Sequence, residues 1–132
     1  VTVIVSDDRI SSPVLSSYDI AIVLNQPSLD KFLPKVKPGG MLIYDGNGII
    51  NPPTRSDITI YRIDAMAKAA EMRNNKVFNM IVLGGLLRVV PFLPDDALER
   101  ALYKTLPERH HKLIPLNMKA VEEGKKIIDK CV

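Results

Sequence analysis

The side chains best placed to do chemistry lie in two loops, and each loop follows an apolar run. The first run is residues 19–24, and the second is Met41–Tyr44. In an open parallel sheet, ligands bind beyond the carboxyl ends of the strands, and helix N-termini at that edge attract anions. We therefore predict that these loops bind a ligand or face a partner protein, through Asn25, Gln26, Ser28, Asp45 and Asn47.

The sequence contains no self-contained catalytic constellation. There is no Ser/His/Asp arrangement, Walker loop or GxGxxG motif, so no catalytic residue is predicted. The segment Asp45–Gly48 offers two of the oxygen ligands of a calcium loop but lacks the closing Glu, which favours a plain turn. The adjacent pair His110 and His111 would point about 100° apart on a helix and could not share one metal ion. We predict no metal site in this chain.

The histidine pair is flanked by Arg109 and Lys112. This composition favours a solvated connection between helices. A surface for an acidic partner is the functional alternative.

Composition bounds the class of protein. A chain of 132 residues with 46% apolar composition can bury one core, so we expect a single domain over residues 1–132. A net charge of +3, no Trp and seven other aromatic residues argue against nucleic-acid binding. Cys131 is the single cysteine and cannot alone hold a disulfide, a zinc ion or an iron–sulfur cluster. No apolar run approaches the roughly 20 residues that span a bilayer, so we expect a cytoplasmic protein without membrane contact.

Strand and helix signals alternate in the first half of the chain. We expect strands at Val1–Val5, at the two runs named above and at Ile58–Ile63. Ser28 is expected to cap a helix that ends at Pro38-Gly39-Gly40, and Asp64 to cap the helix after the last strand.

The second half of the chain reads as helical. Strong helix formers, apolar stripes and the Pro94-Asp95 start predict four helices, at residues 65–72, 77–90, 95–106 and from about 115. Within the second of these, Gly84-Gly85 predicts close approach of a neighbouring element, with approach of a ligand as the alternative. Asn79 is expected to make a buried structural hydrogen bond. The fold class predicted is α/β: a three-layer Rossmann-like domain with a mostly parallel sheet and a helical C-terminal half.

Several motifs in the same order resemble one family. These are YDIAIVLNQPSLDKFLPKVKPGG, the helix starting Asn79-Met80-Ile81-Val82-Leu83-Gly84, NMKAVEEG at 117–124 and the opening VTVIVSDDRISSPV. Together they resemble the gamma subunit, or gamma domain, of 2-oxoacid:ferredoxin (acceptor) oxidoreductases, the family that acts on pyruvate, 2-ketoisovalerate or 2-oxoglutarate. The resemblance covers essentially the whole chain.

The resemblance implies a non-catalytic gamma subunit of a cytoplasmic complex that oxidatively decarboxylates a 2-oxoacid to acyl-CoA and reduces ferredoxin. It implies alpha and beta subunits, and in some complexes delta, as partners, and thiamine diphosphate, iron–sulfur clusters and coenzyme A as cofactors of the assembled complex. This chain alone is expected to hold no cofactor. The family domain begins with a glycine-rich strand–turn–helix that this sequence lacks, so we expect that segment to be missing here.

Two alternatives from other functional classes remain open at this stage. The turn before Met41 also resembles the Lys-Pro-Gly-Gly turn of S-adenosylmethionine-dependent methyltransferases, but the cofactor loop of those enzymes is missing and the C-terminal half is helical. The other alternative is a stand-alone Rossmann-like binding module. Which 2-oxoacid the implied complex oxidises is not encoded in these residues.

Overall fold

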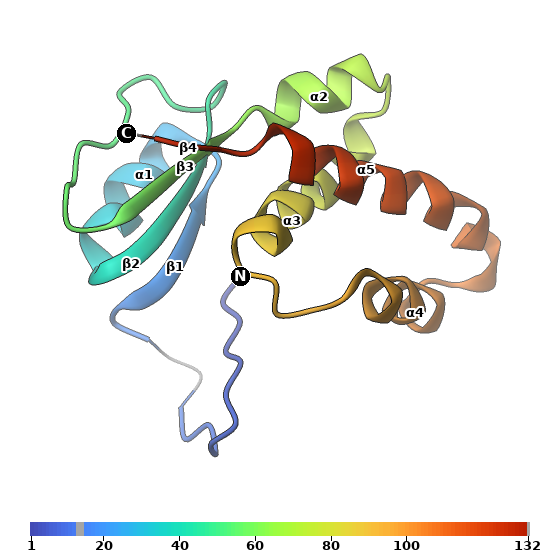
Figure 1. Ribbon diagram of the computed structural model, residues 1–132, viewed down its shortest axis with the longest axis horizontal. Helices are drawn as coiled ribbons and strands as arrows, with labels where there is room; N and C mark the ends of the chain where they lie inside the picture. The colour runs from blue at the N-terminus through green and yellow to red at the C-terminus, as the bar shows by residue number, and fades with distance from the viewer. Residues whose placement is uncertain (13–14, 132) are drawn as a thin grey trace.

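A four-stranded, mostly parallel sheet forms the centre of the molecule (Figure 1). The structure is a computed structural model that describes residues 1–12 and 15–131. The strands are β1 (Tyr18–Val23), β2 (Val36–Asp45), β3 (Thr59–Ile63) and β4 (Asp129–Lys130), in the order β1-β2-β3-β4. The first three are parallel to one another, and β4 pairs antiparallel with β3.

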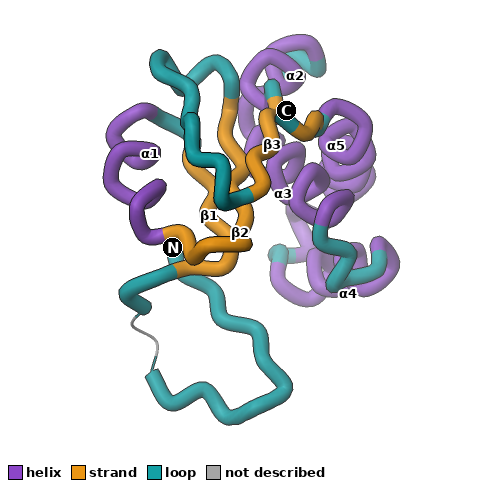
Figure 2. The backbone as a smooth tube through the Cα atoms, turned by 60° about the vertical axis from the view of Figure 1, so that its left-hand side comes forward, coloured by secondary structure: helices purple, strands orange, loops and turns teal. Residues whose placement is uncertain are grey.

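Helices cover both faces of this sheet, which confirms the predicted three-layer α/β fold (Figure 2). One face carries α1 (Gln26–Phe32) and the short 3-10 helix η1 (Leu33–Lys35). The other face carries the larger layer, whose elements are α2 (Ala65–Glu71), η2 (Asn75–Val77), α3 (Phe78–Val89) and α5 (Ile114–Ile127). Between α3 and α5 the chain forms α4 (Asp95–Thr105) and η3 (Glu108–Leu113).

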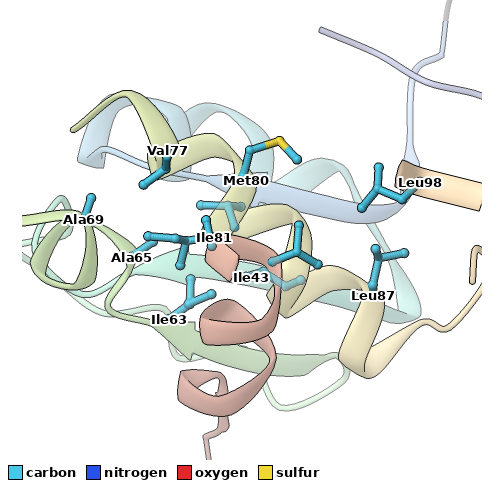
Figure 3. Close-up of a cluster of buried hydrophobic side chains, with 12 residues drawn as sticks. Ile43, Ile63, Ala65, Ala69, Val77, Met80, Ile81, Leu87 and Leu98 are labelled. Atoms are coloured by element: carbon cyan, nitrogen blue, oxygen red, sulfur yellow. The ribbon is translucent and has the colours of Figure 1, made fainter. Parts of the chain in front are cut away.

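The unbroken apolar run in β2 follows from this double cover. Leu42 and Tyr44 pack on the α1 side, whereas Ile43 points into the cluster on the α3 side, and all three are buried. Figure 3 shows Ile43 and Ile63 of the sheet among the side chains of the α3 layer. Because successive strand residues face opposite sides, a strand between two helical layers must be apolar at every position.

The antiparallel helices α3 and α5 meet at backbone-to-backbone distance. A Cβ atom built on Gly84 would lie 2.0 Å from the Val121 carbonyl oxygen, and one on Gly124 would lie 1.9 Å from the Ile81 carbonyl oxygen. No residue with a side chain fits either position in this arrangement. The predicted close approach at Gly84 is confirmed, and Gly124 supplies the reciprocal contact.

Three predicted local features are wrong. Val1–Val5 is not a strand; it runs as an irregular, mostly exposed segment because no other strand pairs with it. Pro38-Gly39-Gly40 does not precede the second strand but lies inside β2 as an irregularity, with Gly39 at φ +82°. Asn79 is exposed rather than buried, because it lies on the face of α3 turned away from the sheet and α5.

We predict that Gly84→Ala will destabilise the fold by about 2 kcal/mol, because the clash with the Val121 carbonyl outweighs the gain in helix propensity. The measurement is urea unfolding followed by circular dichroism.

Gly85→Ala is the matched control, since its new methyl group would meet the ends of two side chains, those of Ile63 and Ile128, rather than a backbone carbonyl oxygen. It gains the same helix propensity and should stay within about 1 kcal/mol of the unmodified protein. Equal stability of Gly84→Ala and the unmodified protein would contradict the close contact.

An ion pair ties the start of α4 to the end of α5. Lys125 Nζ lies 2.6 Å from Asp95 Oδ1, and this hydrogen bond lowers the pKa of the Asp95 carboxyl. A lowered folded-state pKa means that the stabilisation is present above the unfolded-state pKa, near 3.9 for Asp, and is lost as pH falls through the folded-state pKa.

We therefore expect Asp95→Asn to lower stability at neutral pH by at most about 1 kcal/mol, because the pair is partly exposed to solvent. The difference from the unmodified protein should shrink to nothing as pH is lowered below the ordinary Asp range. Asp96→Asn is the control, because the Asp96 pair with Arg100 is longer, at 3.7 Å, and more exposed. Unfolding curves over a pH series measure both, and a difference that grows on acidification would refute this linkage.

Candidate functional site

The loop after β1 is shaped by Asn25, which caps helix α1. Its Oδ1 accepts a hydrogen bond from the Ser28 backbone N–H at 2.9 Å. The predicted cap, Ser28, is therefore wrong: α1 starts at Gln26, and Ser28 is the donor to the cap. Pro27 at the start of the helix has no N–H to satisfy, which favours this earlier start.

Gln26 fastens this helix start to the loop that follows β2. Its Oε1 accepts hydrogen bonds from the Ile50 and Asn51 backbone N–H groups at 2.9 and 2.8 Å. Its Nε2 donates to Asp30 Oδ1 at 2.9 Å. Both ends of the Gln26 amide therefore have partners within the domain.

Asp45 fastens the same loop from its other end. It is fully buried, at 0% exposure, and ends β2. Its Oδ1 accepts from the Asn47 N–H at 2.7 Å and its Oδ2 from the Met66 N–H, in the first turn of α2, at 3.0 Å. The carboxylate thus accepts a backbone N–H in the first turn of α2 that has no partner within that helix, and it joins the loop after β2 to α2.

The expected cap of α2, Asp64, does not do this with its side chain. Asp64 instead pairs with Arg62, whose Nε lies 3.1 Å from Asp64 Oδ1. The Asp45 carboxylate, at the end of the neighbouring strand β2, accepts the hydrogen bond that the Asp64 side chain was expected to accept. Asp64 is the N-cap residue of α2, as predicted, but its side chain makes no capping hydrogen bond, because the Asp45 carboxylate accepts the Met66 N–H.

Gly48 brings the two candidate loops into direct contact. A Cβ atom on Gly48 would lie 1.9 Å from the Leu24 carbonyl oxygen, so only glycine lets the loop after β2 approach the end of β1 this closely. The structure thus brings together the predicted residues from the two loops. The side chains of Asn25, Gln26 and Asp45 form hydrogen bonds within the domain, whereas Ser28 and Asn47 do so through their backbone N–H groups.

The two remaining residues, Ser28 and Asn47, present free polar groups. Asn47 is exposed and Ser28 half-buried, and within the described residues neither side chain hydrogen-bonds to another part of the protein. Their backbones are fixed by Asn25 and Asp45, so the outward groups are held in a defined geometry. Such a surface is suited to recognition rather than to acid–base chemistry.

The described residues contain no group of three or more His, Cys, Asp or Glu that could hold a metal ion. Two open cavities of about 300 and 340 Å³ lie away from the two loops. One is lined by residues at the opposite edge of the sheet, such as Asp19 and Lys37, and the other lies between α2 and α5. Across residues 1–12 and 15–131 no helix has the length and apolarity that a membrane span needs.

Sequence reasoning missed a contact between β2 and the end of the chain. The Tyr44 hydroxyl lies 3.8 Å from Cys131 Sγ, and burial, together with this thiol, raises the pKa of Tyr44. Cys131 is half-buried, and its N–H donates to the Ile60 carbonyl. The partners are 87 positions apart, so no local pattern could have joined them.

Comparison with known proteins decides the family. The model of the pyruvate ferredoxin/flavodoxin oxidoreductase family matches residues 1–127. The chain belongs to this family. The family domain described here therefore carries the glycine contact of α3 and α5 and the fastened loops at the carboxyl edge.

The chain is also similar to parts of two oxidoreductase subunits. The chain is 27% identical over 123 residues to the ketoisovalerate oxidoreductase subunit VorA of Methanothermobacter marburgensis, covering 92% of this chain and 25% of VorA. It is 28% identical over 108 residues to the 2-oxoglutarate synthase subunit KorC of Methanocaldococcus jannaschii, covering 80% of this chain and 58% of KorC. The chain thus spans a quarter of VorA and just over half of KorC.

Solved structures share the fold. The gamma subunit of a keto/oxoacid ferredoxin oxidoreductase from Geobacter sulfurreducens aligns with a TM-score of 0.74 at 21% identity, over 92% of this chain and 66% of that one. A 2-oxoglutarate:ferredoxin oxidoreductase from Magnetococcus marinus, with 2-oxoglutarate, coenzyme A and succinyl-CoA bound, aligns with a TM-score of 0.78 at 22% identity, over 92% and 21%. At these identities the likeness establishes the fold.

We predict that Asp45→Asn will destabilise the family domain by about 1–3 kcal/mol, because an amide can accept only one of the two N–H bonds and turns a donor toward the other. Urea unfolding measures the loss, and amide hydrogen exchange should show faster exchange at Asn47 and Met66. Asp129→Asn, at an exposed position of β4, is the control and should leave both measurements unchanged. Unaltered exchange at Met66 in Asp45→Asn would contradict the assigned role.

Proposed function

We propose that this chain is the gamma component of a heteromeric, cytoplasmic 2-oxoacid:ferredoxin oxidoreductase. The complex oxidatively decarboxylates a 2-oxoacid, transfers the acyl group to coenzyme A and reduces ferredoxin, and this component performs no bond-making step itself. The observation that carries the proposal is the family match over residues 1–127.

The chemistry of the carboxyl edge supports a non-catalytic role. Asp45, the buried carboxylate there, is occupied by two backbone donors, and the Gln26 amide has partners at both ends. A general acid or base needs free access to a substrate proton, which this carboxylate does not have. What the edge offers outward is a fixed pair of polar groups, Ser28 and Asn47.

The proposal names the alpha and beta subunits, and delta where the complex has one, as partners of this surface. Thiamine diphosphate belongs to the alpha and beta subunits, and the iron–sulfur clusters belong to chains or domains other than this one. Coenzyme A is bound in the Magnetococcus marinus relative. Cys131 is the single cysteine of the sequence, which supports placing the clusters elsewhere.

The proposal is tested by Asn47→Trp in the full-length protein, expressed with its neighbouring subunits and purified through a tag on another subunit. An indole on this exposed, backbone-fixed position should block docking of the partner and reduce recovery of this chain by about tenfold or more. The melting temperature of the isolated protein should stay unchanged, because the exposed Asn47 side chain makes no hydrogen bond with the described residues.

The matched control is Asn75→Trp, which places the same indole on an exposed position in the connection between α2 and α3. It should leave recovery at the level of the unmodified protein. Full recovery of Asn47→Trp in the complex would show that this edge is not the contact surface.

A further inference from the structure

The net positive charge of the chain is concentrated in one short region. Residues 104–119 carry four basic side chains and one acidic one, which equals the net +3 of the whole chain. The other residues hold 14 basic and 14 acidic side chains and are neutral overall. The region also contains both histidines of the sequence.

These residues form a corner where α4 ends, η3 turns and α5 begins, at the side of the molecule away from the sheet (Figure 1). We call it the basic corner; its cations are Lys104, Arg109, Lys112 and Lys119. All four are exposed, and none forms an ion pair with the described residues. By contrast, the two aspartates in the first turn of α4 have cationic partners, because Asp95 pairs with Lys125 and Asp96 with Arg100.

Local contacts hold the basic corner in one shape. The rings of Tyr103 and His111 meet edge to face, with centroids 5.1 Å apart. His111 Nε2 donates to the Leu106 carbonyl oxygen at 2.9 Å, and Arg109 Nε donates to His110 Nε2 at 3.2 Å. A surface that is already ordered loses less entropy when a partner binds.

Two large apolar side chains of the same corner are exposed. Tyr103 is 47% exposed and Leu113 is 41% exposed, and they come from the end of α4 and the end of η3. Exposed tyrosine and arginine with an apolar centre and a charged rim are the composition of protein interfaces. A nucleic-acid surface calls for a stronger charge excess than +3.

We propose that the basic corner is a docking surface for a protein with an acidic surface that carries an apolar residue at its centre. The charged rim steers and orients the partner, and Tyr103 with Leu113 forms the apolar contact. This surface is separate from the loops at the carboxyl edge, and the inference does not depend on the oxidoreductase proposal.

The test measures binding of two fluorescein-labelled peptides to the full-length protein at low ionic strength, by anisotropy. One peptide is polyglutamate, and the other alternates Glu with Leu. Both should bind, the Glu/Leu peptide more tightly, and Lys104→Glu/Lys112→Glu should weaken both by about tenfold or more. Leu113→Ser should remove the advantage of the Glu/Leu peptide while leaving polyglutamate binding unchanged.

The control is Lys76→Glu/Lys130→Glu, which changes net charge equally at exposed positions beyond the opposite end of α5. This control variant should alter the affinity for either peptide by less than about twofold, although its net charge falls by the same amount. Equal weakening by both double variants would overturn the proposal, since binding would then follow net charge alone. Tighter binding of a DNA duplex or of phosphatidylserine vesicles than of the Glu/Leu peptide, lost in Lys104→Glu/Lys112→Glu, would also overturn it in favour of another polyanion.

Discussion

The contact between α3 and α5 through Gly84 and Gly124 is the constraint on which the rest of the domain depends. Two helix backbones lie so close that a single methyl group would meet a carbonyl oxygen at either position. This pair forms the layer that buries Ile43 and Ile63 of the sheet. Without it, one face of β2 and β3 would lose its cover, and strands that are apolar on both faces could not remain in solution as a folded sheet.

The arrangement of the loops at the carboxyl edge of the sheet depends on the helices that cover β2. Once β2 is buried on both sides, Asp45 at its end is buried as well, and a buried carboxylate must be satisfied by donors. The first turn of α2 and the loop after β2 supply them. Gln26 holds the later part of the loop after β2, at Ile50, and Gly48 lets this loop approach the end of β1 closely. Polar side chains at this edge therefore fix the shape of the two loops.

Much of this fold could be predicted from local patterns. Apolar runs of strand length located β1, β2 and β3, the Pro-Asp start at Pro94 located α4, and an apolar stripe after Pro115 located α5. The glycine pair in α3 correctly indicated a close neighbour. Each of these signals depends on residues near one another in the chain.

The failures share a different physical cause, which is a partner distant in sequence. Val1–Val5 has the composition of a strand but no strand beside it. Asp64 is the N-cap residue of α2, but Asp45 accepts the hydrogen bond that its side chain was expected to make. Ser28 lost its role to Asn25, because the start of the helix depends on which side chain reaches the free N–H groups. Asn79 was expected to be buried because the residues around it in the sequence are apolar. Which face of α3 is exposed depends instead on where α5 packs. For the candidate site, residue types pointed to two loops that the structure brings together, but they did not show which side chains form hydrogen bonds within the domain.

The central claim is that this chain works as a non-catalytic part of a 2-oxoacid:ferredoxin oxidoreductase. The most direct test is purification of the full-length protein from its native cells, with mass spectrometry of the accompanying chains and an assay of coenzyme A-dependent 2-oxoacid oxidation. The account predicts thiamine diphosphate-binding and cluster-binding chains in the purified material, activity in the complex, and none in the isolated chain. A protein that purifies alone and is stabilised against heat by S-adenosylmethionine would contradict it.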